Sequence, residues 1–238
     1  MKLSKRLETV ASMVTKGNRA ADVGCDHGFV PIFLVESGIS PLAVAADVRP
    51  GPLSRAKEHI KEHRLEEKIQ TRLSDGLANI KPGEADSLIM SGIGGILMMR
   101  LLQDEEHTAK SFKELILSPQ SEVFDVRRYL VSNGYLIEYE HMLCDEGKYY
   151  FIFHVLVKKD EREWSEEEYR YGKDICKDDM KTFLAYLEKE ERQYEQILEK
   201  MKQAPENDRA AQRIAQLHQD ITCLKKRRQL VYDCGCFA

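Results

Sequence analysis

The sequence predicts an α/β protein with a doubly wound, mostly parallel sheet, followed by an antiparallel pair of long helices. The sheet is predicted because five short apolar segments alternate with helical ones and end in turn residues. The helical pair is predicted by a three-four repeat of apolar residues on both sides of a break at Pro205 and Asn207. Glycine and short apolar runs give way to charge-rich helix near residue 160, so we expect domains over 1–159 and 160–238.

The composition is typical of a globular protein of the cytoplasm. The 238 residues are 42% hydrophobic, which is enough to form a core. The net charge of −4 argues against general coating of nucleic acid. No apolar run is long enough to span a bilayer, and no apolar signal core follows the basic N-terminus, so we expect no membrane partner. The six cysteines form no C-x-x-C pair, so we expect no metal site and a reducing compartment.

The expected strands are short apolar runs bounded by turn residues. The parallel strands are expected at 20–23, 43–48, 68–73, 86–90 and 114–117, with helices near 32–35, 53–63 and 122–132. Two further runs, at 135–142 and 149–157, are joined by a polar turn and predict a hairpin. This hairpin would add one antiparallel edge strand to the sheet.

The N-terminal segment has helical spacing and a basic face. A helix is predicted over 3–14 by apolar residues at Leu3, Leu7, Val10, Ala11 and Val14. Residues 1–19 contain five lysines and arginines, Lys5 and Arg6 among them, against one glutamate. This face is either a solvated surface or a patch that contacts phosphates.

Two heptad-patterned helices are predicted in the last third of the chain. The repeat comprises Cys176, Met180, Phe183, Leu187, Tyr194, Ile197 and Met201, and then Ala210, Ile214, Leu217, Ile221, Leu224 and Val231. This pattern, with a proline-containing turn in the middle, predicts an antiparallel coiled-coil hairpin with a buried apolar seam. Cys234 and Cys236 in the tail are assigned no role.

A candidate ligand site follows from the residues at the strand ends. Gly24 and Gly28 lie between the first strand and a helix, a geometry that brings backbone amides against a nucleotide-like ligand. Asp47 ends the second strand, where an acidic side chain can accept both hydroxyls of a ribose. Asp75 and Gly76 end the third strand and are either part of the site or a turn dipeptide. Because carboxyl ends of parallel strands line one crevice, we expect these residues to converge.

These motifs resemble those of known enzymes. The turn Asp22-Val23-Gly24-Cys25-Asp26-His27-Gly28, followed by Asp47, Asp75-Gly76 and a terminal hairpin, is similar to class I S-adenosylmethionine-dependent methyltransferases, which have a Rossmann-like sheet. With Ser91-Gly92-Ile93-Gly94-Gly95 and the coiled-coil hairpin, essentially the whole chain resembles the bacterial tRNA (adenine(22)-N(1))-methyltransferase family. Two features depart from wider patterns. The usual class I turn has glycine at Asp26, and the fourth loop lacks the Asn/Asp-Pro-Pro-Tyr/Phe of many enzymes that methylate exocyclic amines.

The resemblance implies S-adenosylmethionine as cofactor, tRNA as partner, and a role for each matching residue. The implied cofactor-binding residues are Asp22, Gly24, Cys25, Gly28, Asp47, Val48, Asp75, Gly76, Ser91 and Gly92. Asp47 would hold the ribose hydroxyls, Val48 would lie against the adenine, and Asp75 would accept from its amino group. Ser91 and Gly92 would face the methyl group and the target base, with Gly94 among the substrate contacts.

Asp26 is the predicted catalytic residue. Methylation at N1 develops positive charge on adenine, and a nearby carboxylate would stabilise that charge. The alternatives are that Asp26 binds the cofactor's ammonium group or caps the following helix. His27 either contacts the substrate or is a hydrogen-bonded structural histidine.

Contacts to tRNA are also expected outside this site. The candidates are Lys5 and Arg6 in the N-terminal helix and the dense basic run Lys225, Lys226, Arg227 and Arg228. Residues 166–238 contain 14 lysines and arginines against 15 aspartates and glutamates, so this arm is not basic overall. It either contacts tRNA or is a solvated coiled coil or a dimerisation element.

The predicted function is methyl transfer from S-adenosylmethionine to N1 of an adenine in tRNA, at position 22 by the resemblance. Two alternatives are a methyltransferase for a small molecule or a protein, and a non-catalytic RNA-binding or scaffold protein with a nucleotide-binding fold. A nicotinamide oxidoreductase is disfavoured, since the missing middle glycine would crowd a pyrophosphate. No obligate protein partner is expected.

Overall fold

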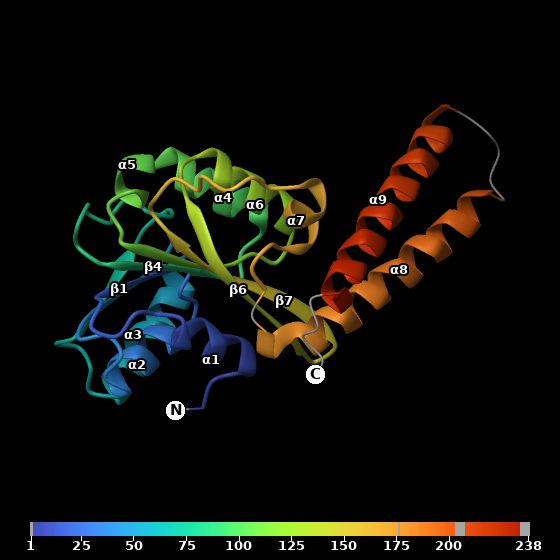
Figure 1. Ribbon diagram of the computed structural model, residues 1–238. Coiled ribbons are helices and arrows are strands. Elements are labelled where there is room, and N and C mark those ends of the chain that lie inside the picture. The colour runs from blue at the N-terminus through green and yellow to red at the C-terminus, as the bar shows by residue number, and fades with distance from the viewer. Residues whose placement is uncertain (1, 176, 203–207, 234–238) are drawn as a thin grey trace.

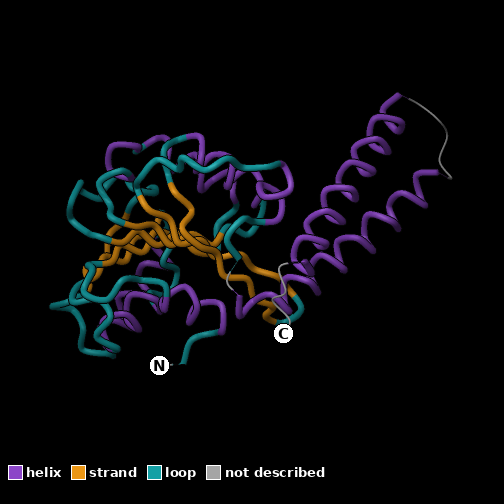
Figure 2. Tube along the Cα trace, in the orientation of Figure 1, coloured by secondary structure: helices purple, strands orange, loops and turns teal. Residues whose placement is uncertain are grey.

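A seven-stranded sheet forms the centre of the protein, and helices cover both of its faces (Figures 1 and 2). The computed structural model describes residues 2–175, 177–202 and 208–233. The strands are β1 (Ala20–Val23), β2 (Ala43–Asp47), β3 (Ile69–Leu73), β4 (Ser87–Ser91), β5 (Glu114–Ser118), β6 (Leu136–Asp145) and β7 (Lys148–Leu156). Their order in the sheet is β3-β2-β1-β4-β5-β7-β6, so the predicted doubly wound sheet is confirmed.

The antiparallel strand does not lie at the edge of the sheet, where the sequence placed it. β7 pairs antiparallel with β5 on one side and with β6 on the other, so β6 is the edge strand and runs in the direction of β1–β5. The chain crosses from β5 through a helix to β6 and leaves one position open between them. The tight turn after β6 then returns β7 into that position.

The helices on the two faces of the sheet enclose two apolar cores (Figure 1). On one face lie α1 (Lys5–Ser12), α2 (Phe29–Glu36) and α3 (Pro50–Glu62), and on the other α4 (Gly95–Asp104), α5 (Glu106–Ala109), α6 (Val123–Ser132) and α7 (Glu166–Tyr171). All residues of β1, β2 and β5 are buried, as expected for parallel strands covered on both faces. α4, α5 and α7 were not predicted, and α5 and α7 are each too short for a periodic pattern.

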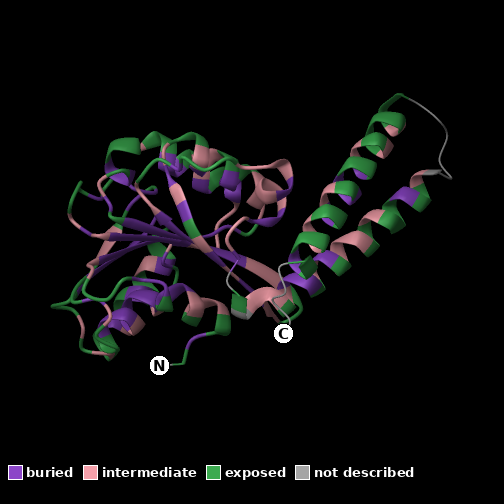
Figure 3. Ribbon diagram, viewed as in Figure 1, coloured by how far each residue is buried: buried purple, intermediate pink, exposed green. Residues whose placement is uncertain are grey.

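Two long helices project from this body (Figure 1). They are α8 (Met180–Lys202), which follows the short η1 (Lys177–Asp179), and α9 (Asp208–Asp233). Their outer seam buries Leu198, Leu217 and Ile221, and buried positions alternate with exposed ones along both helices (Figure 3). The predicted helical hairpin is therefore present. Cys176, Cys234, Cys236 and the predicted turn at Pro205 and Asn207 lie outside the described residues.

One seam position was predicted wrongly, and the base of the hairpin is more embedded than a free coiled coil. Ile197 is 38% exposed, whereas its neighbour Leu198 is buried, because the seam advances by four residues rather than three after Tyr194. At the base, Phe183 and Leu224 belong to the same apolar core as the sheet. This shared core anchors the hairpin to the body.

Candidate active site

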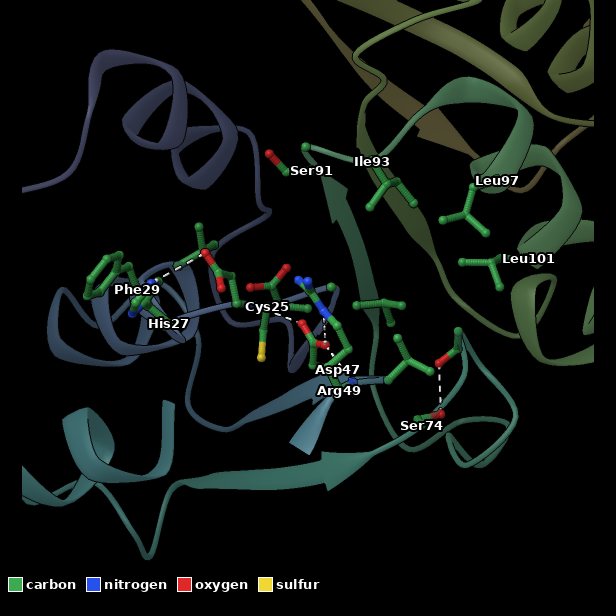
Figure 4. A pocket seen from close by; sticks show the side chains of 18 of the residues that line it. Cys25, His27, Phe29, Asp47, Arg49, Ser74, Ser91, Ile93, Leu97 and Leu101 are labelled. Atoms are coloured by element: carbon green, nitrogen blue, oxygen red, sulfur yellow. Dashed lines mark hydrogen bonds and ion pairs between the residues drawn. The ribbon is translucent and has the colours of Figure 1, made fainter. Parts of the chain in front are cut away.

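A cavity of about 580 Å³ opens at the carboxyl ends of β1, β2 and β4 (Figure 4). Among the residues that line it, the following were predicted from the sequence: Arg6, Asp22, Gly24, Cys25, Asp26, His27, Asp47, Val48, Asp75, Gly76, Ser91 and Gly92. Segments far apart in the chain converge here because parallel strands present their carboxyl ends at one edge.

Three other predicted residues do not line this cavity. Gly28 is the left-handed N-cap of α2, where an added Cβ would lie 3.1 Å from the Cβ of Ala56, so it allows α3 to pack closely. Gly94 precedes α4 and is close to the hydroxyl of Ser121. Lys5 is exposed on α1.

The predicted basic run of α9 also lies away from the cavity, and its side chains contact other parts of the protein. Lys225 and Arg228 form ion pairs with Glu191 of α8, and Lys226 pairs with Glu167 of α7. Arg227 donates a hydrogen bond to the carbonyl of Lys173. These contacts favour a role in holding the base of the hairpin, and a contact of this run with tRNA stays a prediction.

Two buried carboxyl groups form the floor of the cavity. Asp47 accepts hydrogen bonds from the backbone amides of Arg49, at 2.9 Å, and Asp26, at 3.3 Å, so each carboxylate oxygen is oriented by one amide. Burial, together with the charge of Asp47, raises the pKa of Asp22 to about 7, although Arg6 acts in the opposite direction. A cationic ligand group beside Asp22 would stabilise its ionised form.

Cys25 lies next to these carboxyl groups but is not a nucleophile. Burial, reinforced by Asp22, Asp47 and Asp26, raises the pKa of its thiol well above the usual range. The thiol therefore stays protonated at neutral pH. Cys25 contributes to the site through its place in the turn, where its carbonyl accepts from the amide of Gly28.

Apolar side chains form one wall of the cavity. Val48 is 55% exposed at the end of β2, and Leu97 and Leu101 extend from α4 on the side opposite His27 and Phe29 (Figure 4). Gly76 has a positive φ of 55° and passes directly against Leu101, where a side chain would collide. An exposed valine and two leucines in one cavity provide a slot for a flat apolar group such as an adenine ring.

Arg6 lies at the mouth of the cavity. Its guanidinium donates a hydrogen bond of 2.5 Å to the hydroxyl of Ser91 and lies 5.5 Å from the ring centre of Tyr150. Both terminal nitrogens, and the side-chain nitrogen of Gln120, are 3.6 Å from the position that a Cβ would occupy at Gly92. A side chain at residue 92 would therefore narrow the entrance where a second substrate would meet the first.

His27 and Asp26 line the cavity next to each other, and His27 lies on the side away from Leu97 and Leu101 (Figure 4). His27 stacks on Phe29 at 5.2 Å and on His59 at 5.7 Å, which fixes its ring, while its Nδ1 is buried and has no hydrogen-bond partner among the described residues. The carboxylate of Asp26 is 58% exposed and lies 3.6 Å from His27 and 3.5 Å from Arg55. Asp26 can therefore present its charge to a ligand in the cavity.

Several residues of the cavity were not predicted from the sequence. The missed residues are Leu7, Val23, Phe29, Val30, Arg49, Ser74, Ile93, Leu97, Leu101 and Gln120. Gln120 was within reach of prediction, because it follows the fifth parallel strand and such loops line the ligand crevice. Leu97 and Leu101 had no comparable signal, since apolar residues of a helix usually face the core.

The residues of the cavity fit S-adenosylmethionine. Asp47 matches a ribose diol, the Val48 slot matches an adenine, and buried Asp22 matches an ammonium group. The sheet and this cavity together define a class I methyltransferase that uses S-adenosylmethionine. A family model described as a methyltransferase domain matches residues 3–153.

Comparison with known proteins identifies the family. The chain is 28% identical over 232 residues to the tRNA (adenine(22)-N(1))-methyltransferase of Bacillus subtilis, covering 95% of this chain and 97% of that one. A Streptococcus pneumoniae structure, a candidate tRNA (m1A22) methyltransferase solved with S-adenosyl-L-methionine, is 31% identical with a TM-score of 0.83, covering 95% and 100% of the two chains. The M. capricolum TrmK complex with S-adenosylhomocysteine is 25% identical with a TM-score of 0.84, covering 97% and 100%. The chain belongs to the bacterial tRNA (adenine(22)-N(1))-methyltransferase family.

The pKa of Asp22 predicts how cofactor affinity depends on pH. Asp22 must ionise to pair with the cofactor's ammonium group, so affinity should rise with pH until it levels off above about 7. Below that pH, affinity should fall by up to about tenfold per unit, since one proton must be released on binding. Calorimetric titration from about pH 5.5 to about pH 7.5, where the α-amino group is still charged, measures this.

The matched variant for this experiment is Asp22→Asn, which keeps the shape but cannot ionise. It should bind the cofactor weakly and with the pH dependence removed. A wild-type affinity that stays flat across the range, or an Asp22→Asn variant with the same pH profile, would contradict the assignment of Asp22 to the ammonium group.

Proposed function

We propose that this protein transfers the methyl group of S-adenosylmethionine to N1 of adenine 22 in tRNA. Membership of the family supports the reaction, and the observation that carries it here is the convergence of Asp22, Asp47 and Ser91 on one cavity. None of the helices in the described part of the chain could cross a membrane. We also propose that the protein acts in the cytoplasm and needs no obligate protein partner.

The contribution of the protein to the reaction is to position the acceptor base against the cofactor. The bound cofactor supplies an electrophilic methyl group, and transfer needs the acceptor nitrogen in line with it. Ser91 and Gly92 line the cavity beside Arg6, and Gly92 has no side chain to occupy the space in which a flat base would lie. In a paired region, N1 is hidden, so the target adenine must be turned out of its stack to reach this position.

The charges around the cavity suit a product that carries positive charge. N1 needs no proton removed before it attacks, but the methylated ring becomes cationic. Arg6 at the mouth would oppose that charge if it touched the ring, so we assign it to a phosphate of the target nucleotide. Asp26, which also lines the cavity, has the sign that stabilises the ring. We further propose that residues 1–159 bind the cofactor and that residues 160–238 form a helical domain.

Methylation of a defined tRNA tests this function. The purified protein is incubated with S-adenosylmethionine and an unmodified tRNA transcript, and the product is digested and analysed by mass spectrometry. We expect 1-methyladenosine at position 22, and no product from a transcript with guanosine there. Incorporation into another atom or another position, or none at all, would contradict the proposed function.

A further inference from the structure

A second cavity, of about 420 Å³, lies next to the active site between the β6–β7 turn and α8. Lys148, Tyr149 and Tyr150 of β7 form one side, and Lys189 and Glu190 of α8 form the other. We call this cavity the hairpin groove. Its volume is in the range of sites that hold small organic ligands.

The hairpin groove is continuous with the mouth of the active site. Gln120 lines both cavities, and Arg6, which is bonded to Ser91 in the active site, lies over the ring of Tyr150 in the groove. The reason is the length of β7. β5 pairs with β7 only as far as Phe153, whereas the segment from Lys148 to Ile152 pairs with β6 alone and extends past the end of β5. The β6–β7 hairpin thus forms a wall beside the site where the target base enters.

The groove combines cationic and aromatic groups. The ammonium of Lys189 lies 5.1 Å from the ring centre of Tyr149, which packs on Tyr186 at 5.4 Å, and Lys148 is exposed beside them. Glu190 is the acidic residue of the groove, and its carboxylate accepts a hydrogen bond of 3.0 Å from the hydroxyl of Tyr194. Lysines next to tyrosine rings are a combination that binds unpaired nucleotides, because ammonium groups contact phosphates while rings stack on bases.

We infer that the hairpin groove binds a nucleotide of the tRNA that neighbours the target adenine. Turning the adenine out of its stack removes a stacking partner from its neighbours. The ring of Tyr149 replaces that partner, and Lys148 and Lys189 bind the adjoining phosphate. This inference rests on the proposed function and adds a substrate site to it.

Substitution of the two lysines tests the inference on a surface where folding is not at risk. Lys148→Ala and Lys189→Ala, alone and combined, are compared with Lys158→Ala, which removes an exposed lysine just beyond the far end of β7. The affinity for tRNA is measured over a range of salt concentrations, with calorimetry of S-adenosylmethionine as a check on the active site. We expect the salt slope to fall by roughly 1 for each groove lysine, with little change in the control and in cofactor affinity.

The aromatic part of the groove has its own variants. Tyr149→Ala should weaken tRNA binding by roughly 5- to 150-fold, which corresponds to the loss of one stacked base, while Tyr149→Phe should retain it. If both groove lysine variants bind tRNA with the affinity and salt slope of the Lys158→Ala control, the inference is overturned. Failure of the wild-type protein to methylate tRNA would instead overturn the proposed function, so the two failures are distinguishable.

Discussion

Replacing Asp26 by asparagine should lower the rate of methyl transfer by about 10²- to 10³-fold, the range for loss of one group that stabilises charge in the transition state. Asp26 lines the cavity, and its carboxylate is 58% exposed. When tRNA covers it, water is excluded and the attraction between the carboxylate and the methylated adenine strengthens. The substitution keeps the shape and removes the charge, so single-turnover rates with saturating cofactor measure the electrostatic effect.

Cofactor affinity distinguishes this role from the alternatives. The capping alternative is already excluded, because Gly28 is the N-cap of α2 and no side chain caps that helix. If Asp26 binds the cofactor's ammonium group, Asp26→Asn should lose cofactor affinity; if it acts on the adenine, affinity measured by calorimetry should be retained. Loss of affinity with an unchanged rate at saturation would therefore contradict the catalytic role.

Replacing Asp26 by glycine is a second test of the same charge. Asp26 has a φ of 48°, a left-handed conformation that asparagine and glycine accept and that strains alanine. Asp26→Gly also restores the residue that most class I turns have here. It should be as inactive as Asp26→Asn, since both lack the carboxylate. An active glycine variant would show that the charge is dispensable.

Residues of the site that follow parallel strands could be predicted from the sequence because the topology of the sheet alone determines where they lie. Once 20–23, 43–48 and 68–73 are identified as parallel strands, the residues that follow them must meet at one edge of the sheet. Asp47 and Asp75 needed no knowledge of packing to be found, whereas Ser91 was assigned a role only through the resemblance to a known family. The same rule, applied to the loop after β5, would have found Gln120.

Contacts between elements that are distant in the sequence could not be predicted in this way. The hydrogen bond from Arg6 to Ser91 depends on where α1 packs on the sheet, which periodicity does not specify. The position of β7 inside the sheet depends on a crossover that leaves a gap, and a hairpin at the edge has the same sequence pattern. The choice of Leu198 over Ile197 depends on the relative rotation of α8 and α9, and adjacent apolar residues leave that open.

A buried ion pair, also outside the reach of sequence patterns, predicts the largest effect on stability. Arg127 of α6 and Glu140 of β6 are both fully buried and lie 2.7 Å apart. Arg127 also donates to the carbonyls of Tyr169 and Arg170, at 3.1 and 2.9 Å. One guanidinium thus joins the edge strand to α7, against which α9 packs.

Replacing Glu140 by glutamine should lower the free energy of unfolding by about 3–5 kcal/mol, because the charge of Arg127 is left buried without its counter-charge. The matched control is Glu166→Gln, which weakens the partly exposed ion pairs of Glu166 with Arg128 and Arg170 and should cost less than about 1 kcal/mol. Urea denaturation measures both. A cost for Glu140→Gln as small as that of the control would show that the guanidinium is compensated by the two carbonyls.

The location of the pair also predicts which part of the protein responds first. Arg127 holds α7 and, through it, the base of the helical hairpin. Asp22 and Asp47 lie on β1 and β2, which β4, β5 and β7 separate from β6 in the sheet. At urea concentrations below the unfolding transition, Glu140→Gln should therefore raise the rate of hydrogen exchange in α7 and α9, while cofactor affinity stays near that of the wild type. Exchange that rises equally in β1 and β2 would show that the body and the hairpin open as one cooperative unit.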